Sequence, residues 1–214
     1  YIGIESVYSM DGDTPPITAI VELAEKYKAA LIVDEAHAVG LYKHGIIQQL
    51  GLQDKVFARV ITFGKALGCH GAAVLGNTDL RNYLVNFARS FIYTTAASFH
   101  QVAAVKMAYE FLGEADSEIS RLKNNIELFK QGVTTSDDYH LLPSDSAIQC
   151  IVLKSNEKAK EAAAELQQTG LDVRPILSPT VPQGLERIRI CLHSYNTSEE
   201  INLLTNTINK LIYA

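Results

Sequence analysis

The sequence predicts an α/β fold with a mainly parallel sheet, followed by a smaller α+β domain. In the first half, short apolar runs alternate with segments of helical periodicity, which is the rhythm of parallel β-α-β units. One run, residues 29–33, is continuously apolar and stops at Asp34, as expected of a strand buried on both faces. With 47% hydrophobic and 20% charged residues, the 214-residue chain is of globular type and can bury a sizeable core.

Apolar runs in the first half predict strands at residues 2–7, 29–33, 60–61, 72–75 and 91–94. We expect Asp13 or Thr14 to cap the first helix, with Pro15 and Pro16 in its first turn, where a proline loses no needed N–H. Thr78 is expected to cap a helix between the last two strands. Two further helices are predicted, one capped by Ser98 and reaching to about residue 112, and one with apolar residues from 119 to 129.

The pattern starts again in the second half. Residues 147–153 predict a strand and residues 157–168 a helix that ends at Gly170. Apolar and polar residues alternate from 187 to 192, which predicts a strand that buries one face only. Thr197 and Glu200 form a capping box before the last helix. We therefore expect a large-domain portion at 1–112, a connecting helix at 113–137 and a small domain at 138–214.

Charge and composition exclude several classes of protein. A net charge of −5 argues against a nucleic-acid partner, since phosphate binding needs clustered Lys and Arg. No run of eighteen apolar residues occurs, so no membrane span is expected. Three widely spaced cysteines fit neither a disulfide framework nor a zinc site, and favour the cytoplasm. Because the sequence begins inside a predicted strand, we expect the natural protein to have residues before Tyr1.

Polar side chains follow three of the predicted strands. These are Ser9, then Asp34 with His37, then Thr62 with Lys65. Each alone has an ordinary interpretation as a helix cap or a solvated loop residue. Together they suit pyridoxal phosphate, which needs a lysine for its covalent bond, a carboxylate at its ring nitrogen and hydroxyl groups for its phosphate.

Three segments carry a resemblance to a known family. Residues 5–13 (ESVYSMDGD), 34–40 (DEAHAVG) and 62–65 (TFGK) resemble the α-oxoamine synthases. These fold-type I pyridoxal-phosphate enzymes condense an amino acid with an acyl thioester. Residues 87–95, 146–149 and 178–184 are most similar to the branch that makes 8-amino-7-oxononanoate in biotin synthesis. That branch implies L-alanine and pimeloyl-CoA or a pimeloyl carrier protein as substrates, with loss of CO₂.

The resemblance implies a role for each residue at the cofactor. Lys65 corresponds to the lysine that bonds the cofactor, and Asp34 to the carboxylate at the pyridine nitrogen. His37 corresponds to the residue that bonds the phenolic oxygen, while Ser9 and Thr62 correspond to further cofactor contacts.

Other residues are implied at the substrate and at a subunit interface. The family acts as homodimers with sites between subunits, so Thr95 is expected to reach the phosphate in the neighbouring subunit. Thr180 and Arg189 are expected to face the substrate, Arg189 at the amino-acid carboxylate. The family's glycine-containing phosphate loop, ring-stacking histidine and N-terminal arginine have no counterpart in this sequence.

Alternatives remain at this point. Within the family these are a 2-amino-3-ketobutyrate ligase or a serine palmitoyltransferase-like enzyme. A non-catalytic domain is disfavoured because Lys65 and Asp34 are both present. Residues 34–37 also spell the box of DEAH helicases, but the chain lacks the P-loop that such nucleotide hydrolysis needs.

Overall fold

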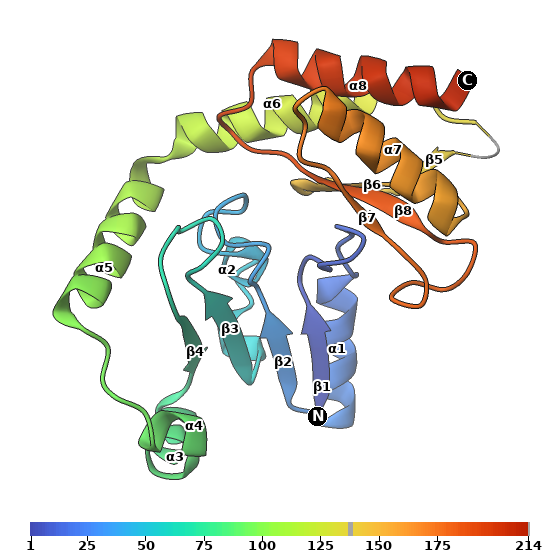
Figure 1. Ribbon diagram of the computed structural model, residues 1–214. Coiled ribbons are helices and arrows are strands. Elements are labelled where there is room, and N and C mark those ends of the chain that lie inside the picture. The colour runs from blue at the N-terminus through green and yellow to red at the C-terminus, as the bar shows by residue number, and fades with distance from the viewer. Residues whose placement is uncertain (137–138, 214) are drawn as a thin grey trace. The chain divides into compact units, whose positions relative to one another are not determined.

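The computed structural model describes residues 1–136 and 139–213, and the side chains of all of these except 212 and 213. The chain forms two compact units (Figure 1). Unit 1 comprises residues 1–7 and 14–116, and unit 2 comprises residues 8–13 and 117–214. The short segment 8–13 follows the first strand of unit 1 in the chain, yet it belongs to unit 2.

A four-stranded sheet in the order β1-β2-β3-β4 forms the centre of unit 1. Its strands are β1 (Ile2–Glu5), β2 (Leu31–Asp34), β3 (Ala58–Thr62) and β4 (Ala72–Gly76). The first three strands are parallel and β4 is antiparallel, so the predicted mainly parallel sheet is confirmed. Glu5 pairs with Asp34, which in turn pairs with Val60. The carboxyl ends of β1, β2 and β3 therefore meet at one edge.

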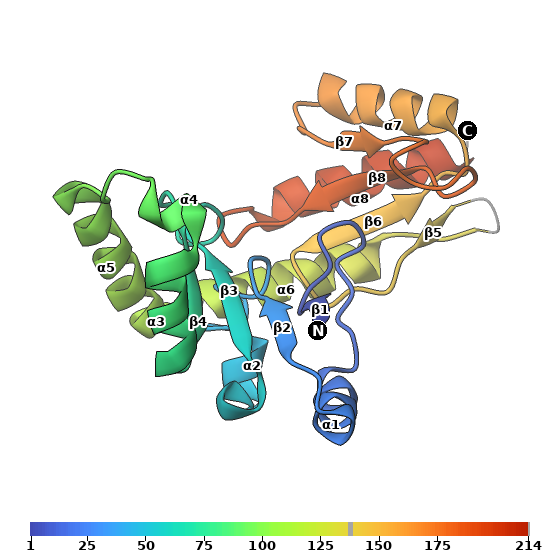
Figure 2. The same ribbon diagram turned by 90° about the horizontal axis from the view of Figure 1, so that it is seen from below.

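The helical segments of unit 1 are α1 (Ile17–Tyr27), α2 (Ile46–Gln49), the 3₁₀ turn η1 (Gln53–Lys55), α3 (Thr78–Phe87), α4 (Arg89–Ile92) and α5 (Phe99–Glu114). Helix α1 buries Ile17, Val21 and Ala24 in a cluster with Leu31 and Val33 of β2. Helices α1 and α2 lie on the same face of the sheet (Figure 2). That face holds the main core of unit 1.

The start of α1 differs from the prediction. The helix begins at Ile17 after Pro16, which has ψ 73°, and neither Asp13 nor Thr14 caps it. The reason is the Pro-Pro pair, because a residue that precedes proline is disfavoured in the helical region. This restriction keeps Pro15 out of the helix, and Pro16 is the residue just before the first helical residue.

The predicted strand at residues 91–94 is wrong. Residues Arg89–Ile92 form the short helix α4, and β4 is the last strand of the sheet. A run of aromatic residues forms a strand only where a neighbouring strand pairs with the run and other side chains pack on it. Phe91, in α4, and Tyr93, in the turn after it, are instead exposed. The predicted Ser98 cap of α5 is confirmed by a bond from the Gln101 N–H at 3.2 Å.

The cap of α3 is Asn77 and not Thr78. The Asn77 Oδ1 atom accepts the Leu80 N–H at 2.8 Å, and Thr78 is the first helical residue. We expect Asn77→Ala to lower the free energy of unfolding by about 1 kcal/mol, the usual cost of losing such a cap. Thr78→Ala is the matched control and should change it by less than about 0.5 kcal/mol. Urea unfolding compares the two, and an equal loss in both variants would contradict the assignment.

Unit 2 is an antiparallel sheet with helices on one face. Its strands, in the order β5-β6-β8-β7, are β5 (His140–Leu141), β6 (Ile148–Val152), β7 (Arg174–Ile176) and β8 (Arg187–Cys191). The helices α6 (Asp116–Gly132), α7 (Asn156–Gln168) and α8 (Ser198–Tyr213) lie together on that face (Figure 1). Phe129, Leu166 and Ile201 are fully buried there. The capping box before α8 is confirmed by bonds between Thr197 and Glu200.

The strand β8 buries more than the predicted single face. Arg187 is only 4% exposed, although it lies on the face opposite to Ile188 and Ile190. Its guanidinium forms an ion pair with Asp11. The segment 8–13 covers this second face, which the alternating pattern of residues could not reveal.

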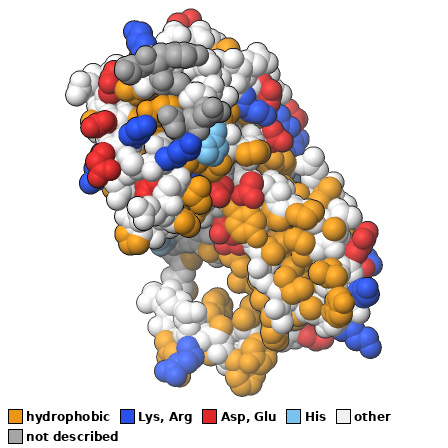
Figure 3. Space-filling view, turned by 90° about the vertical axis from the view of Figure 1, so that its right-hand side faces the viewer, with side chains coloured by type: hydrophobic (Ala, Val, Ile, Leu, Met, Phe, Trp, Pro, Cys, Tyr) orange, Lys and Arg blue, Asp and Glu red, His pale blue; other side chains and the backbone are white. Residues whose placement is uncertain are grey.

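Part of the surface of unit 1 is hydrophobic (Figure 3). Hydrophobic side chains gather on the part of unit 1 that presents the β1 edge and α1, in the lower half of Figure 3. Tyr1, just before β1, and Tyr27, the last residue of α1, are both exposed. None of the helices in the described parts of the chain is both long and apolar enough to cross a lipid bilayer. The predicted domain boundary at residues 112 and 113 stays a prediction, and the boundary at 137 and 138 lies outside the described residues.

Candidate active site

Asp34 lies at the carboxyl end of β2, in the middle of the parallel strands. Its Oδ1 atom accepts the Ala36 N–H at 2.7 Å, which turns the chain out of the sheet. Its carbonyl oxygen accepts the Ser6 N–H at 2.8 Å and the Ser6 hydroxyl at 3.2 Å. These bonds fix the position of a half-buried carboxylate at the strand end.

Lys65 lies in a tight loop that follows β3. The Gly68 N–H bonds to the Lys65 carbonyl at 3.0 Å, and the Cys69 N–H bonds to the Phe63 carbonyl at 2.7 Å. The side chain of Leu67 is buried under this loop. The backbone on both sides of Lys65 is therefore anchored, while its side chain is exposed.

The loop that carries Lys65 packs directly on the segment that carries Asp34 and His37. Gly40, with φ at +102°, approaches so closely that a Cβ there would lie 2.4 Å from the Cβ of Ala66. Val39 of the first segment and Leu67 of the loop belong to one buried hydrophobic cluster, together with residues of β3 and α5. The two segments therefore form one packed surface at the carboxyl edge of the sheet.

Thr62 contributes a polar atom that lacks a partner. Its Oγ1 is buried and has no hydrogen-bond partner among the described residues. Buried hydroxyl groups are nearly always paired, so an unpaired one beside a candidate site points to a missing acceptor or donor. This atom lies at the end of β3, three residues before Lys65, and the residues present thus fit a polar group bound at this edge.

The predicted residues divide between the two units. Asp34, His37, Thr62 and Lys65 meet at the sheet edge of unit 1, and His37 is half-buried. Thr95 is also in unit 1, in an exposed segment. Three others belong to unit 2, namely the half-buried Ser9 and Arg189 and the exposed Thr180.

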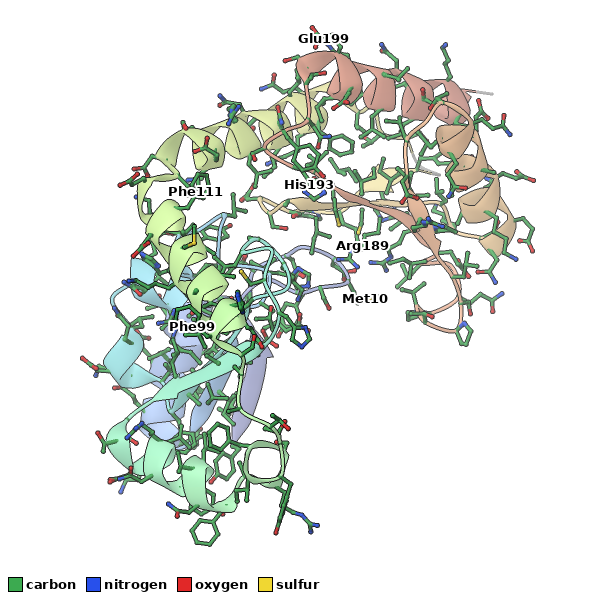
Figure 4. All side chains as sticks on the ribbon, turned by 60° about the vertical axis from the view of Figure 1, so that its left-hand side comes forward. Met10, Phe99, Phe111, Arg189, His193 and Glu199 are labelled. Atoms are coloured by element: carbon green, nitrogen blue, oxygen red, sulfur yellow. The ribbon has the colours of Figure 1, made fainter. Side chains whose placement is uncertain are left out.

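The two arginines of β8 differ in their partners. Arg187 pairs with Asp11, and its Nε donates to the Leu185 carbonyl at 2.9 Å. The Nε of Arg189 is buried and has no partner among the described residues. Arg189 lies on the face of the sheet where segment 8–13 runs, near Met10 (Figure 4). Arg189 thus has donor capacity left for a carboxylate.

Cys150 is opposite Arg189 on the neighbouring strand and is fully buried. Burial raises the pKa of its thiol to about 12, and its Sγ donates to the Met10 carbonyl at 3.2 Å. All three cysteines are free, and Cys191 is exposed.

We expect iodoacetamide at pH 8 to alkylate Cys191 and to leave Cys150 unmodified in the folded protein. The pKa of Cys150 lies above the value near 9 of an unfolded chain, so the folded state keeps the proton longer. The contribution of this raised pKa to the free energy of unfolding is complete below pH 9 and is lost as the pH rises toward 12. Mass spectrometry of the peptides measures the labelling, and equal labelling of both cysteines would contradict the assignment.

One buried pair was missed by the sequence reasoning. Glu35 is fully buried and forms an ion pair with Arg59 of β3, which is 6% exposed. The available signal was Arg59 itself, a charged residue among the apolar residues 58–61 of β3. Strand β3 pairs with β2, and Glu35 follows Asp34 at the end of β2. A charge at such a position needs a buried partner of opposite sign.

Comparison with known proteins adds the family. A family model described as aminotransferase class I and II matches residues 1–208. The chain belongs to this family. This membership contradicts the DEAH-helicase alternative. Among curated relatives, an 8-amino-7-oxononanoate synthase of Emericella nidulans is 42% identical over 97% of this chain and 53% of that protein.

Solved structures of the same family are also similar. A serine palmitoyltransferase (SPT) with PLP has a TM-score of 0.90 at 27% identity, covering 98% of this chain and 54% of that chain. The 8-amino-7-oxononanoate synthase of Francisella tularensis has a TM-score of 0.83 at 29% identity, covering 100% of this chain and 63% of that chain. The fold-type I class and the resemblance to α-oxoamine synthases are thus confirmed. The chain spans about half the length of the curated relatives it matches.

Proposed function

We propose that the protein is a pyridoxal-phosphate-dependent acyltransferase that condenses L-alanine with a pimeloyl thioester and releases CO₂, giving 8-amino-7-oxononanoate. The observation that carries the proposal is the edge of the unit 1 sheet. There Asp34, the unpaired hydroxyl of Thr62 and the anchored loop of Lys65 follow adjacent strands. Curated relatives named 8-amino-7-oxononanoate synthase support the choice of substrates.

Four residues of unit 1 would hold the cofactor. When bound, pyridoxal phosphate supplies a protonated ring that withdraws electrons from the reacting carbon. Asp34 would keep a negative charge beside the ring nitrogen, and His37 would donate to the phenolic oxygen. Thr62 would use its unpaired hydroxyl as a further contact. Lys65 would provide the primary amine for the covalent bond and, once the amine of the amino acid had displaced it, would take the α-proton of the amino acid.

The remaining residues that the resemblance assigns to the substrate and the cofactor belong to unit 2. Arg189 would bind the carboxylate of the amino acid, since Arg187 is already paired with Asp11. Thr180 would face the substrate as well. Ser9 would contact the cofactor from the segment 8–13.

We further propose a homodimer in the cytoplasm. Thr95 would reach the cofactor phosphate of the second subunit. It lies between Tyr93 and Phe99, which are 81% and 82% exposed. Exposed aromatic side chains in one segment are typical of an interaction surface. Phe99 and Phe111, at opposite ends of α5, extend this exposed apolar surface (Figure 4).

The substrates distinguish this function from its nearest alternative. Similarity to serine palmitoyltransferase structures makes a sphingolipid-type reaction the second candidate. We expect L-alanine with a pimeloyl thioester to release free thiol at least about 10-fold faster than L-serine with palmitoyl-CoA or glycine with acetyl-CoA, the discrimination that pocket contacts of a few methylenes provide. A thiol-release assay measures all three. Faster release with serine or glycine would assign the protein to another branch of the family.

A further inference from the structure

The buried ion pair of Glu35 and Arg59 joins the residue that follows Asp34 to strand β3. Arg59 Nε donates to Glu35 Oε2 at 2.6 Å, and the Arg59 Nη2 group also contacts this carboxylate. Glu35 follows Asp34 in the chain and precedes His37 by two residues. The proposed function assigns roles to Asp34 and His37 and none to this pair.

The pair joins three separate segments of unit 1. Glu35 Oε1 accepts the Ile47 N–H at 2.9 Å, and Arg59 Nη2 donates to the His44 carbonyl at 2.7 Å. Gly45, with φ at +108°, lies so close that a Cβ there would be 2.5 Å from the Glu35 carboxylate. The end of β2, residues 44–47 and β3 are therefore held together through one carboxylate and one guanidinium.

Such a pair is a costly way to stabilise a fold. Two charges lose their water on burial, and apolar side chains of similar volume often serve stability as well or better. Here both charged groups make hydrogen bonds to each other and to backbone groups of the 44–47 segment. A geometric role is thus favoured over a purely stabilising one.

We propose that Glu35 and Arg59 are positioning residues, which hold the segment 34–39 so that Asp34 and His37 present their side chains correctly to the cofactor. The bonds of this segment are the Ala36 N–H to Asp34 Oδ1 and the Ala38 and Val39 N–H groups to the Glu35 carbonyl, at 2.7, 3.0 and 3.1 Å. Loss of the ion pair would loosen these bonds. The consequence for the cofactor rests on the proposed function, whereas the effect on the segment does not.

The test compares two double variants of the protein. Glu35→Gln with Arg59→Met removes both buried charges together, which avoids leaving one of them unpaired. Glu25→Gln with Lys55→Met removes an exposed ion pair of unit 1, whose charged atoms are 2.5 Å apart, and is the matched control. Hydrogen exchange without ligand measures the amides of Ala36, Ala38 and Val39 against those of α1. Absorbance titration with pyridoxal phosphate measures the dissociation constant.

In the buried double variant, we expect the three amides to exchange at least about 10-fold faster while the amides of α1 keep their rates, as in local opening. The dissociation constant for pyridoxal phosphate should rise about 10-fold, as when hydrogen-bond support behind a binding side chain is lost. The control variant should change neither. Unchanged exchange, a uniform rise across unit 1, or faster exchange with an unchanged dissociation constant would overturn the proposal. A wild-type protein that binds no pyridoxal phosphate would overturn the proposed function. The exchange rates would then still show whether the ion pair holds the segment 34–39 in place.

Discussion

Lys65→Ala is expected to abolish turnover, lowering it by at least about 10³-fold, because no other group would replace its amine in the covalent bond and the proton transfer. The exposed side chain lies in a loop anchored by Leu67 and by backbone bonds on both sides. The free energy of unfolding should therefore change by less than about 0.5 kcal/mol. Thiol release with L-alanine and thermal unfolding measure the two effects.

Two further variants control this result. Lys65→Arg should be as inactive as Lys65→Ala, since a guanidinium stays protonated and cannot form the covalent bond. Lys106→Ala removes an exposed lysine of α5 and should leave turnover unchanged. Substantial activity in either Lys65 variant would show that another residue supplies the amine.

Asp34→Asn is expected to retain the cofactor in part and to lose activity by about 10²- to 10³-fold, the range for removing one preorganised electrostatic group. An amide is neutral and cannot stabilise a protonated ring nitrogen as a carboxylate does. The asparagine Oδ1 can still accept the Ala36 N–H, so the turn after β2 should persist. Cofactor absorbance and thiol release follow the two quantities separately.

The exposed Asp54 of η1 provides the matched control for this substitution. Asp54→Asn makes the same chemical change away from the sheet edge and should leave turnover within the error of the assay. If Asp34→Asn kept full activity, the carboxylate would have a role other than the one at the ring nitrogen.

Much of unit 1 could be predicted because its signals are local. The apolar run before Asp34 and the spacing of α1 reflect burial in a parallel sheet, and both elements are present. The strand predicted at residues 91–94 was wrong because an aromatic run forms a strand only where a neighbouring strand pairs with it. The prediction that both prolines lie in the first turn of α1 was wrong because Pro16 restricts the backbone of Pro15 before it.

In the candidate site, too, some features could be predicted from the sequence and others could not. Asp34, Thr62 and Lys65 could be found because each lies at or just after the end of a strand, and the carboxyl ends of parallel strands meet at one edge. The pairing of Arg187 with Asp11 joins residues 176 positions apart, and no local pattern reports it. Arg59 alone indicates a buried partner, but which carboxylate pairs with it depends on the register between β2 and β3.

The central claim is that Lys65 is the residue that bonds pyridoxal phosphate. Borohydride reduction of the protein with pyridoxal phosphate, followed by peptide mapping, tests it most directly. We predict that the reduced cofactor is found on the peptide that contains residues 62–65, with its mass on Lys65. Attachment to a different lysine, or no specific attachment at all, would contradict the account.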